Sequence, residues 1–235
     1  MSPNDEGYAR QVSVLVVTDE RFLDHRPGRG HPERPARLEA VWSGLKSAGL
    51  GDALVCREPR PASDEDLMRC HPSAHLAALV EIDAAGGGLV DGDTVMSPGS
   101  WSAARLAAGA GLVAVAALQA GEADVAFCAV RPPGHHATPS RAMGFCLVNN
   151  LAVTAASLAE AGERVAIVDI DAQQDQVGGV DSVLGQAELV GDFDLIAGSL
   201  EQAGKSRAEY RVAIDDQNFV QWAVSSTRLL GRGVS

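Results

Sequence analysis

The amino-acid sequence predicts one α/β domain built on a central, mainly parallel sheet that is covered on both faces. Segments with strand character alternate along the chain with segments of helical periodicity, which is the order that a parallel sheet with crossover helices requires. The strand segments 124–130 and 164–170 are also apolar along almost their whole length, as strands buried on both faces are. A chain of 235 residues has the length of a single such domain, and we expect it to span residues 1–235.

The individual elements follow in order. Residues 11–18 (QVSVLVVT) are rich in β-branched side chains and predict the first strand. Apolar residues recur at helical spacing between Pro35 and Gly49, which suit the start and the end of a helix. Ser63 and Asp66 are spaced as in a capping box. The later expected elements are an Ala-rich helix at 101–121, a strand at 124–130, a helix at 149–162, a strand at 164–170, and a short strand and a helix within 212–235.

Composition narrows the possible partners and the compartment. The net charge of −12 argues against a nucleic-acid-binding surface, which needs basic patches. The apolar run Val12–Val17 is too short for a signal-peptide core or a membrane span. The four cysteines show no paired spacing and predict reduced thiols of a cytoplasmic protein. We therefore expect neither nucleic acid nor membrane as a partner, and a homo-oligomer stays open.

Polar residues follow the predicted strands at the points where ligands bind in open parallel sheets, beyond the carboxyl ends. The loop after strand 124–130 carries His135 and His136, and strand 164–170 leads to Asp169 and Asp171. A histidine base needs a partner that sets its tautomer, and Asp169 is the candidate. The loop after the first strand adds Asp24, His31, Glu33 and Arg37. This edge of the sheet is the candidate site.

Simpler interpretations of the same residues stay open. Two adjacent histidines on a Gly-Pro loop can be exposed to solvent without a function, and the two aspartates can cap a helix or form an ion pair. His71 and His75 stand four residues apart in a segment that reads as a surface helix. We interpret them as ordinary surface histidines.

Five segments together resemble the zinc-dependent histone deacetylase superfamily, above all its bacterial acetoin-utilisation and acetylpolyamine amidohydrolase-like members. The segments are GHPERPARLEAV, DGDTVMSPGS, RPPGHHA, GFCLVNNLAVTA and VAIVDIDA. They stand in the family's order, and the resemblance covers residues 12–172. It implies an arginase/deacetylase-like three-layer fold and hydrolysis of acetyl-amides by zinc-activated water. The implied substrate is an acetylated small molecule, such as an acetylpolyamine, or an acetyl-lysine peptide.

The resemblance also implies roles for single residues. His135 and His136 match the family's tandem histidines, which serve as general base and as acid or electrostatic helper. Asp169 matches the carboxylate behind the first of them and helps to hold a structural potassium ion, and Asp171 matches a zinc ligand. The positions that match substrate contacts are Arg37 at the inner end of the pocket, Asp93 at its rim, and Gly144 and Phe145 at the tunnel and its wall.

The zinc-binding part of the resemblance breaks off after Asp171. Gln173 stands where the family has its zinc-binding histidine, and catalytic zinc sites usually have three protein ligands. The family's later aspartate ligand has no match in residues 177–235, and a weak match puts Phe193 at the position of its later tyrosine. Solvated carboxylates are the simplest interpretation of the acidic residues of this tail, Asp192, Asp194, Asp215 and Asp216.

These features predict a truncated or internally deleted family member with a diverged tail at 177–235 and a sheet that is incomplete on its C-terminal side. We expect acetyl-amide hydrolysis to be impaired or absent, so whether the chain is an enzyme stays open. The alternatives are a non-catalytic pseudoenzyme that binds a ligand or partner, and a remnant without a settled role. An arginase-like dimetal hydrolase would share the fold, but it needs more Asp and His ligands than these strand ends offer.

Overall fold

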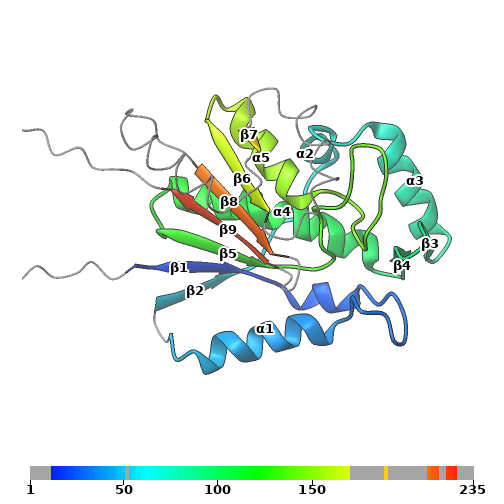
Figure 1. The fold of residues 1–235 in the computed structure, drawn as a ribbon, viewed down its shortest axis with the longest axis horizontal. Coiled ribbons are helices and arrows are strands. Elements are labelled where there is room, and N and C mark those ends of the chain that lie inside the picture. Colours follow the sequence, from blue (N-terminus) through cyan, green and yellow to red (C-terminus); the bar gives the residue numbers. More distant parts are fainter. Residues whose placement is uncertain (1–11, 51–52, 170–187, 190–210, 217–220, 227–235) are drawn as a thin grey trace, which may run out of the picture.

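The computed structural model describes residues 12–50, 53–169, 188–189, 211–216 and 221–226 (Figure 1). A seven-stranded sheet in the order β2-β1-β5-β9-β8-β6-β7 forms its centre. A separate antiparallel hairpin joins β3 (Gly88–Leu89) to β4 (Val95–Met96). The strands of the central sheet are β1 (Val14–Val17), β2 (Leu54–Arg57), β5 (Val125–Ala129), β6 (Val165–Asp169), β7 (Glu188–Leu189), β8 (Arg211–Asp216) and β9 (Gln221–Ser226).

The sheet is parallel except around β9, which runs antiparallel to both of its neighbours, β5 and β8. The predicted central, mainly parallel sheet is therefore confirmed. In residues 212–235, where the sequence predicts one strand and a helix, the structure has two strands, β8 and β9. The backbone partners that β5 and β8 offer on either side explain why residues 221–226 are a strand, because pairing within a sheet overrides local preference. The rest of that segment lies outside the described residues.

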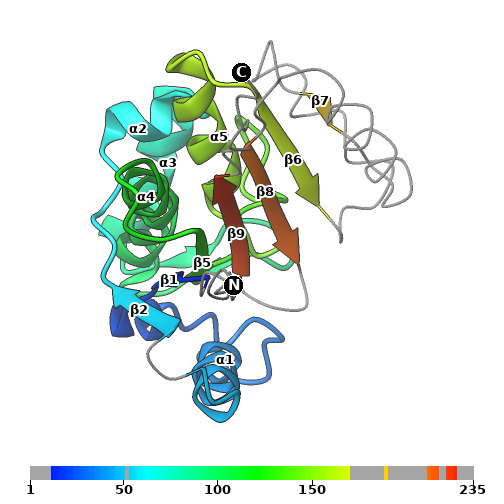
Figure 2. The same cartoon turned by 90° about the vertical axis from the view of Figure 1, so that its left-hand side faces the viewer.

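Helices lie on both sides of this sheet. The helix α1 (Ala36–Ser47) lies on the opposite side of β1 and β2 from the other helices (Figures 1 and 2). Trp42 of α1 donates its Nε1 hydrogen to Thr18 Oγ1 at 3.0 Å and so ties the helix to the end of β1. The helices of the other side are α2 (Asp64–Met68), α3 (Ser73–Ala84), α4 (Ser100–Gln119) and α5 (Asn150–Glu160). The predicted capping box at Ser63 and Asp66 is confirmed at the start of α2.

The Ala-rich helix α4 forms the centre of the core. Its small side chains let neighbouring segments approach closely: a Cβ at Gly109 would lie 1.8 Å from the carbonyl oxygen of Arg60. The segment next to Arg60 is fixed there by Ala62, whose N–H donates to the carbonyl oxygen of Arg105 and whose carbonyl oxygen accepts from the side-chain Nε of Arg105. By length and composition alone α4 could cross a membrane, but 72% of its apolar window is buried inside the fold. In this fold, the apolar composition of α4 is therefore that of a buried core helix.

Candidate active site

The structure brings the predicted acid–base residues together at the carboxyl edge of the sheet. His135 Nδ1 lies 3.5 Å from Asp169 Oδ2, and the two side chains are 5% and 17% exposed. The His136 ring packs edge-on against the His135 ring, with 4.3 Å between the centroids. Because β9 and β8 separate β5 from β6, the loop after β5 must extend along the sheet edge to make this contact. A carboxylate beside Nδ1 favours the tautomer that carries its proton on Nδ1 and the acceptor lone pair on Nε2.

Gly144 and Phe145, the predicted tunnel residues, lie directly beside the tandem histidines. Gly144 has a φ of 55°, and a Cβ there would lie 2.6 Å from Cδ2 of His136. Only glycine therefore allows the ring of His136 to take this place. Phe145 is also left-handed, with a φ of 68°, and its N–H donates to Thr94 Oγ1 at 3.0 Å. A strained backbone held by a specific hydrogen bond is typical of functional sites.

His31 joins three segments at the outer side of this site. Its Nδ1 lies 3.0 Å from the carbonyl oxygen and 3.1 Å from the backbone nitrogen of Glu33, and its Nε2 lies 3.0 Å from the carbonyl oxygen of Asp93. Its ring packs edge-on against Phe145, with 4.8 Å between the centroids. Asp93 itself is exposed. The structure thus places the predicted rim residue next to the wall residue Phe145.

Arg37 lies in the first turn of α1 and is half-buried. The fully buried arginine of the described residues is Arg131, which sequence reasoning missed. Its guanidinium donates to both carboxylate oxygens of Glu33, at 2.5 and 2.6 Å, and to the carbonyl oxygens of Phe22 and His25. An arginine at the end of an apolar strand, with a glutamate in the first loop, is the signal that could have found this pair.

Glu33 is the centre of a buried polar network. His25 Nε2 lies 3.1 Å from Glu33 Oε2, and His25 Nδ1 lies 2.7 Å from Ser100 Oγ at the start of α4. Burial raises the pKa of Glu33, but the hydrogen bonds from His25 and Arg131 outweigh it and lower that pKa to about 2. The network therefore locks the loop after β1, the loop after β5 and α4 to one another.

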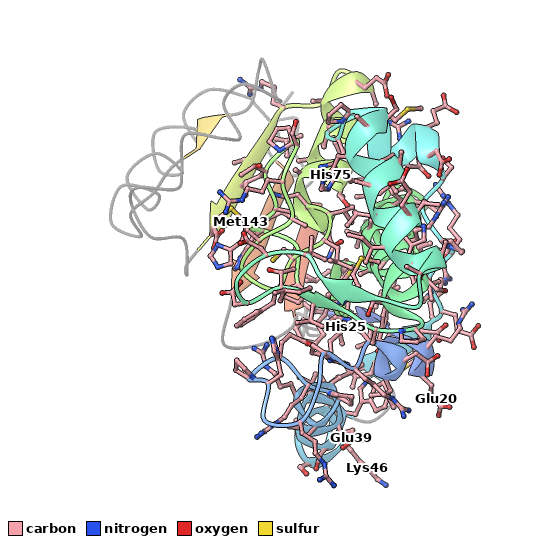
Figure 3. All side chains as sticks on the ribbon, turned by 90° about the vertical axis from the view of Figure 1, so that its right-hand side faces the viewer. Glu20, His25, Glu39, Lys46, His75 and Met143 are labelled. Atoms are coloured by element: carbon pink, nitrogen blue, oxygen red, sulfur yellow. The ribbon has the colours of Figure 1, made fainter. Side chains whose placement is uncertain are left out.

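The interpretation of His71 and His75 as surface histidines is wrong. Their exposed fractions are 1% and 8%, and Figure 3 shows His75 within the body of the fold, whereas Glu39 and Lys46 lie on the outside of α1. Both rings bond to the backbone of the loop between β5 and α5, at the carbonyl oxygens of Pro139 and Leu147. Helical spacing alone does not reveal that a distant loop covers this side of α3.

The predicted zinc position lies outside the described residues. Asp171 and Gln173 lie outside them, as do Asp192, Phe193 and Asp194. In the part of the chain that is described, no three His, Cys, Asp or Glu side chains are grouped as a metal site requires. A single carboxylate and a neutral amide at the family's ligand positions do not fit catalytic Zn²⁺. The role of Asp169 as a potassium ligand stays a prediction.

The described part of the tail brings acidic residues to this edge. In the register of the parallel pair β6 and β8, Asp215 stands opposite Asp169. Asp216, the last residue of β8, is paired with Gln221 of β9. The backbone thus places Asp215 at the level of the predicted acid–base residues, whereas its interpretation as a solvated carboxylate stays open.

The molecule is thus an α/β protein with a mainly parallel sheet, and its His135–Asp169 pair lies at the carboxyl edge, where ligands bind in open α/β sheets. The sequence pattern described as "Histone deacetylase domain" matches residues 31–175, which is more than half of the chain. The chain therefore belongs to the histone deacetylase family.

Individual relatives agree with this assignment. The chain is 45% identical over 144 residues to a histone deacetylase-like amidohydrolase of Pseudomonas aeruginosa, covering 60% of this chain and 38% of the relative. It is 38% identical over 160 residues to a probable deacetylase of Archaeoglobus fulgidus, covering 67% and 44%. The crystal structure of the HDA15 HD domain is similar with a TM-score of 0.70 and 33% identity, covering 77% of this chain and 53% of that one. The chain thus spans about half of these relatives or less, and the predicted deacetylase-like fold is confirmed.

Proposed function

We propose that this chain is a non-hydrolysing member of the histone deacetylase family that binds acetyl-amides at the edge formed by His135, His136 and Phe145. One observation carries the proposal: the largely buried His135–Asp169 pair is retained beside His136, while Gln173 stands where the resemblance implies a metal ligand. A glutamine amide is a poor substitute for imidazole at zinc. The chain would therefore keep recognition and proton handling but lack the Lewis acid that hydrolysis of an amide needs.

The described residues have distinct parts in such binding. His135, with its Nδ1 directed at Asp169, would present Nε2 as an acceptor for a polar hydrogen of the ligand or of a water molecule. The ring of Phe145 offers an apolar wall for an alkyl chain; the ring packs against His31, and the backbone N–H of Phe145 is held by Thr94. The exposed Asp93 carboxylate is an acceptor at the rim for an amide N–H of the ligand.

The charge of the chain favours a cationic ligand class. A net charge of −12 raises the local concentration of positively charged molecules, which suits an acetylpolyamine or an acetyl-lysine within a basic peptide.

We place the chain in the cytoplasm, and its free cysteines support this. Burial raises the pKa of the Cys70 thiol to about 12, so this thiol is unreactive at neutral pH.

The test measures zinc and binding on the same full-length sample. The chain is purified without chelator and dialysed against trace zinc, and its metal content is determined. Acetylputrescine and an acetyl-lysine peptide are then titrated by calorimetry, with putrescine and the unacetylated peptide as controls. We expect zinc far below one ion per chain, binding of the acetylated compounds alone, and no release of acetate.

Two outcomes contradict the proposal. No binding of the acetylated compounds would remove the recognition function. One zinc per chain together with acetate release that Asp171→Ala abolishes would show a working hydrolase instead. In that case Asp215→Asn would tell whether the tail supplies a ligand, because Asp215 is the tail residue opposite Asp169.

A further inference from the structure

The two ring contacts of His71 fix its tautomer. Its Nδ1 lies 3.0 Å from the carbonyl oxygen of Pro139, which can only accept a hydrogen bond. Its Nε2 accepts from the backbone N–H of Asn149 at 2.9 Å. The proton therefore sits on Nδ1, and the lone pair of Nε2 faces Asn149. Burial lowers the pKa of His71 to about 4, so the ring is neutral at physiological pH.

Asn149 connects this ring to the tandem histidines. Its side-chain Nδ2 donates to the carbonyl oxygens of His135 at 3.2 Å and Ala137 at 3.1 Å. Its Oδ1 accepts from the N–H of Ala152 at 2.9 Å and caps α5. Every hydrogen-bonding atom of the Asn149 side chain is thus used, and the N–H that orients its backbone is bound to His71. The backbone on either side of His136 is consequently fixed from α5.

His75 makes a different contact, although it stacks on His71 with 5.0 Å between the ring centroids. Its Nε2 bonds to the carbonyl oxygen of Leu147, two residues before Asn149. His75 lies in α3 and His71 just before it, and their rings are stacked. They nevertheless bond to different residues of the loop between β5 and α5. Of the two, His71 is the one that bonds to Asn149.

We infer that His71 is a positioning residue for the acid–base corner: by holding Asn149 it fixes the carbonyl groups of His135 and Ala137, and thereby the His135 ring against Asp169. The inference rests on the proposed function of His135. His71 lies outside the candidate site but would orient the His135 ring, which would contact the ligand. Only one atom of His71, Nε2, carries this effect, because it is the atom that bonds to Asn149.

The two nitrogens can be separated by substitution. His71→Gln keeps an acceptor near the position of Nε2, whereas His71→Asn keeps a donor near the position of Nδ1. Each variant forfeits one hydrogen bond of the ring, so the two are matched for loss of stability. The readout is the ¹⁵N spectrum, of imidazole and backbone amide groups, of the full-length, ligand-free chain labelled uniformly with ¹⁵N and recorded at a fixed pH near 8.

We expect His71→Asn to displace the imidazole signals of His135 and His136, and His71→Gln to leave both at their wild-type positions. The backbone amide signal of Asn149 should likewise move only in His71→Asn. As a control, His75→Asn, which removes the group near Nε2 and with it the contact at Leu147, should leave the His135 and His136 signals in place. Equal displacement in both His71 variants would mean a general structural role and would overturn the inference, as would unchanged signals in His71→Asn.

A further variant tests the contact between Asn149 and the carbonyl oxygens of His135 and Ala137. Asn149→Asp keeps the acceptor that caps α5 but removes the Nδ2 donor to His135 and Ala137. We expect the same displaced histidine signals, with α5 intact by circular dichroism. If His71→Asn does not fold, this variant decides, and unchanged signals overturn the inference. Because these spectra need no ligand, failure of acetyl-amide binding alone would count against the proposed function and not against this role of His71.

Discussion

Single residues of this chain are constrained most strongly where the backbone meets the tandem histidines. Gly144 has its φ in the left-handed region, and the space where a Cβ would stand is filled by the ring of His136. Sequence reasoning identified Gly144 through the family motif. The contact that explains the glycine depends on how the loop folds back on itself, which no local pattern encodes.

We expect Gly144→Ala to destabilise the chain by about 1–3 kcal/mol and to abolish acetyl-amide binding, because His136 must move. Gly162→Ala is the matched control: Gly162 also has a positive φ, of 83°, but nothing lies within 4 Å of its added Cβ. Urea unfolding and calorimetry of both variants separate backbone strain from displacement of His136. Equal loss of binding in the two variants would refute the explanation.

A second residue-scale prediction concerns the buried network of Glu33. Glu33→Gln leaves the guanidinium of Arg131, which is fully buried, without its countercharge. Breaking a buried pair from one side costs about 3–5 kcal/mol, and we expect a loss of this order in urea unfolding. Asp64→Asn removes the partner of Arg105 in an exposed pair and should change stability very little. A similar small change in Glu33→Gln would show that Arg131 finds other partners.

Gln173 gives a prediction at the position where the family resemblance breaks off. We expect Gln173→His to leave acetate release undetectable, because the family's later aspartate ligand still has no match in the tail. The variant is assayed with added zinc beside the wild-type chain. Turnover restored by this one change would mean that the tail completes a metal site.

At the scale of elements, the sequence predicted those features that local periodicity encodes. The helix after Pro35, the capping box at Ser63 and the Ala-rich helix α4 all form as expected. The sequence predictions are wrong where contacts between residues far apart in the chain determine the structure. β9 is a strand because β5 and β8 flank it, and His71 is buried because the loop between β5 and α5 covers it.

Two helical glycines, Gly109 and Gly44, differ in whether a distant segment packs against them. Substitution by alanine should therefore destabilise the chain at one position and stabilise it at the other. Gly109→Ala in α4 would drive a Cβ into the carbonyl oxygen of Arg60, at 1.8 Å, so we expect a loss of at least about 1–3 kcal/mol. Gly44→Ala in α1 meets nothing within 4 Å and should stabilise the chain by up to about 1 kcal/mol, because alanine is the better helix former. Thermal unfolding of both variants measures the signs. A stabilising Gly109→Ala would mean that residues 60–62 do not pack against α4 as described.

For the whole molecule, two of the buried titratable groups, His71 and Glu33, make stability depend on pH in separate windows. His71 has its pKa lowered from 6.5 to about 4, and Glu33 from 4.5 to about 2. In both cases the unfolded chain binds more protons than the folded chain between the two values, so stability falls as the pH falls. His71 acts between pH 6.5 and about 4, and Glu33 between pH 4.5 and about 2.

We therefore expect the urea midpoint of the wild-type chain to fall already between pH 7 and pH 5, above the range in which ordinary carboxylates titrate. The loss from His71 amounts to at most about 3 kcal/mol once the pH is below its folded pKa. His71→Gln should flatten the curve above pH 5 and leave the decline below pH 4.5. Glu33→Gln should leave the decline above pH 5 and weaken the decline below pH 4.5, part of which stays because the pKa of Asp66 is also lowered by its hydrogen bonds. Parallel curves for the wild-type chain and His71→Gln between pH 7 and pH 5 would show that another group carries this dependence. The two variants thus connect the acid sensitivity of the whole fold to one buried ring and one buried carboxylate, on either side of the tandem-histidine loop.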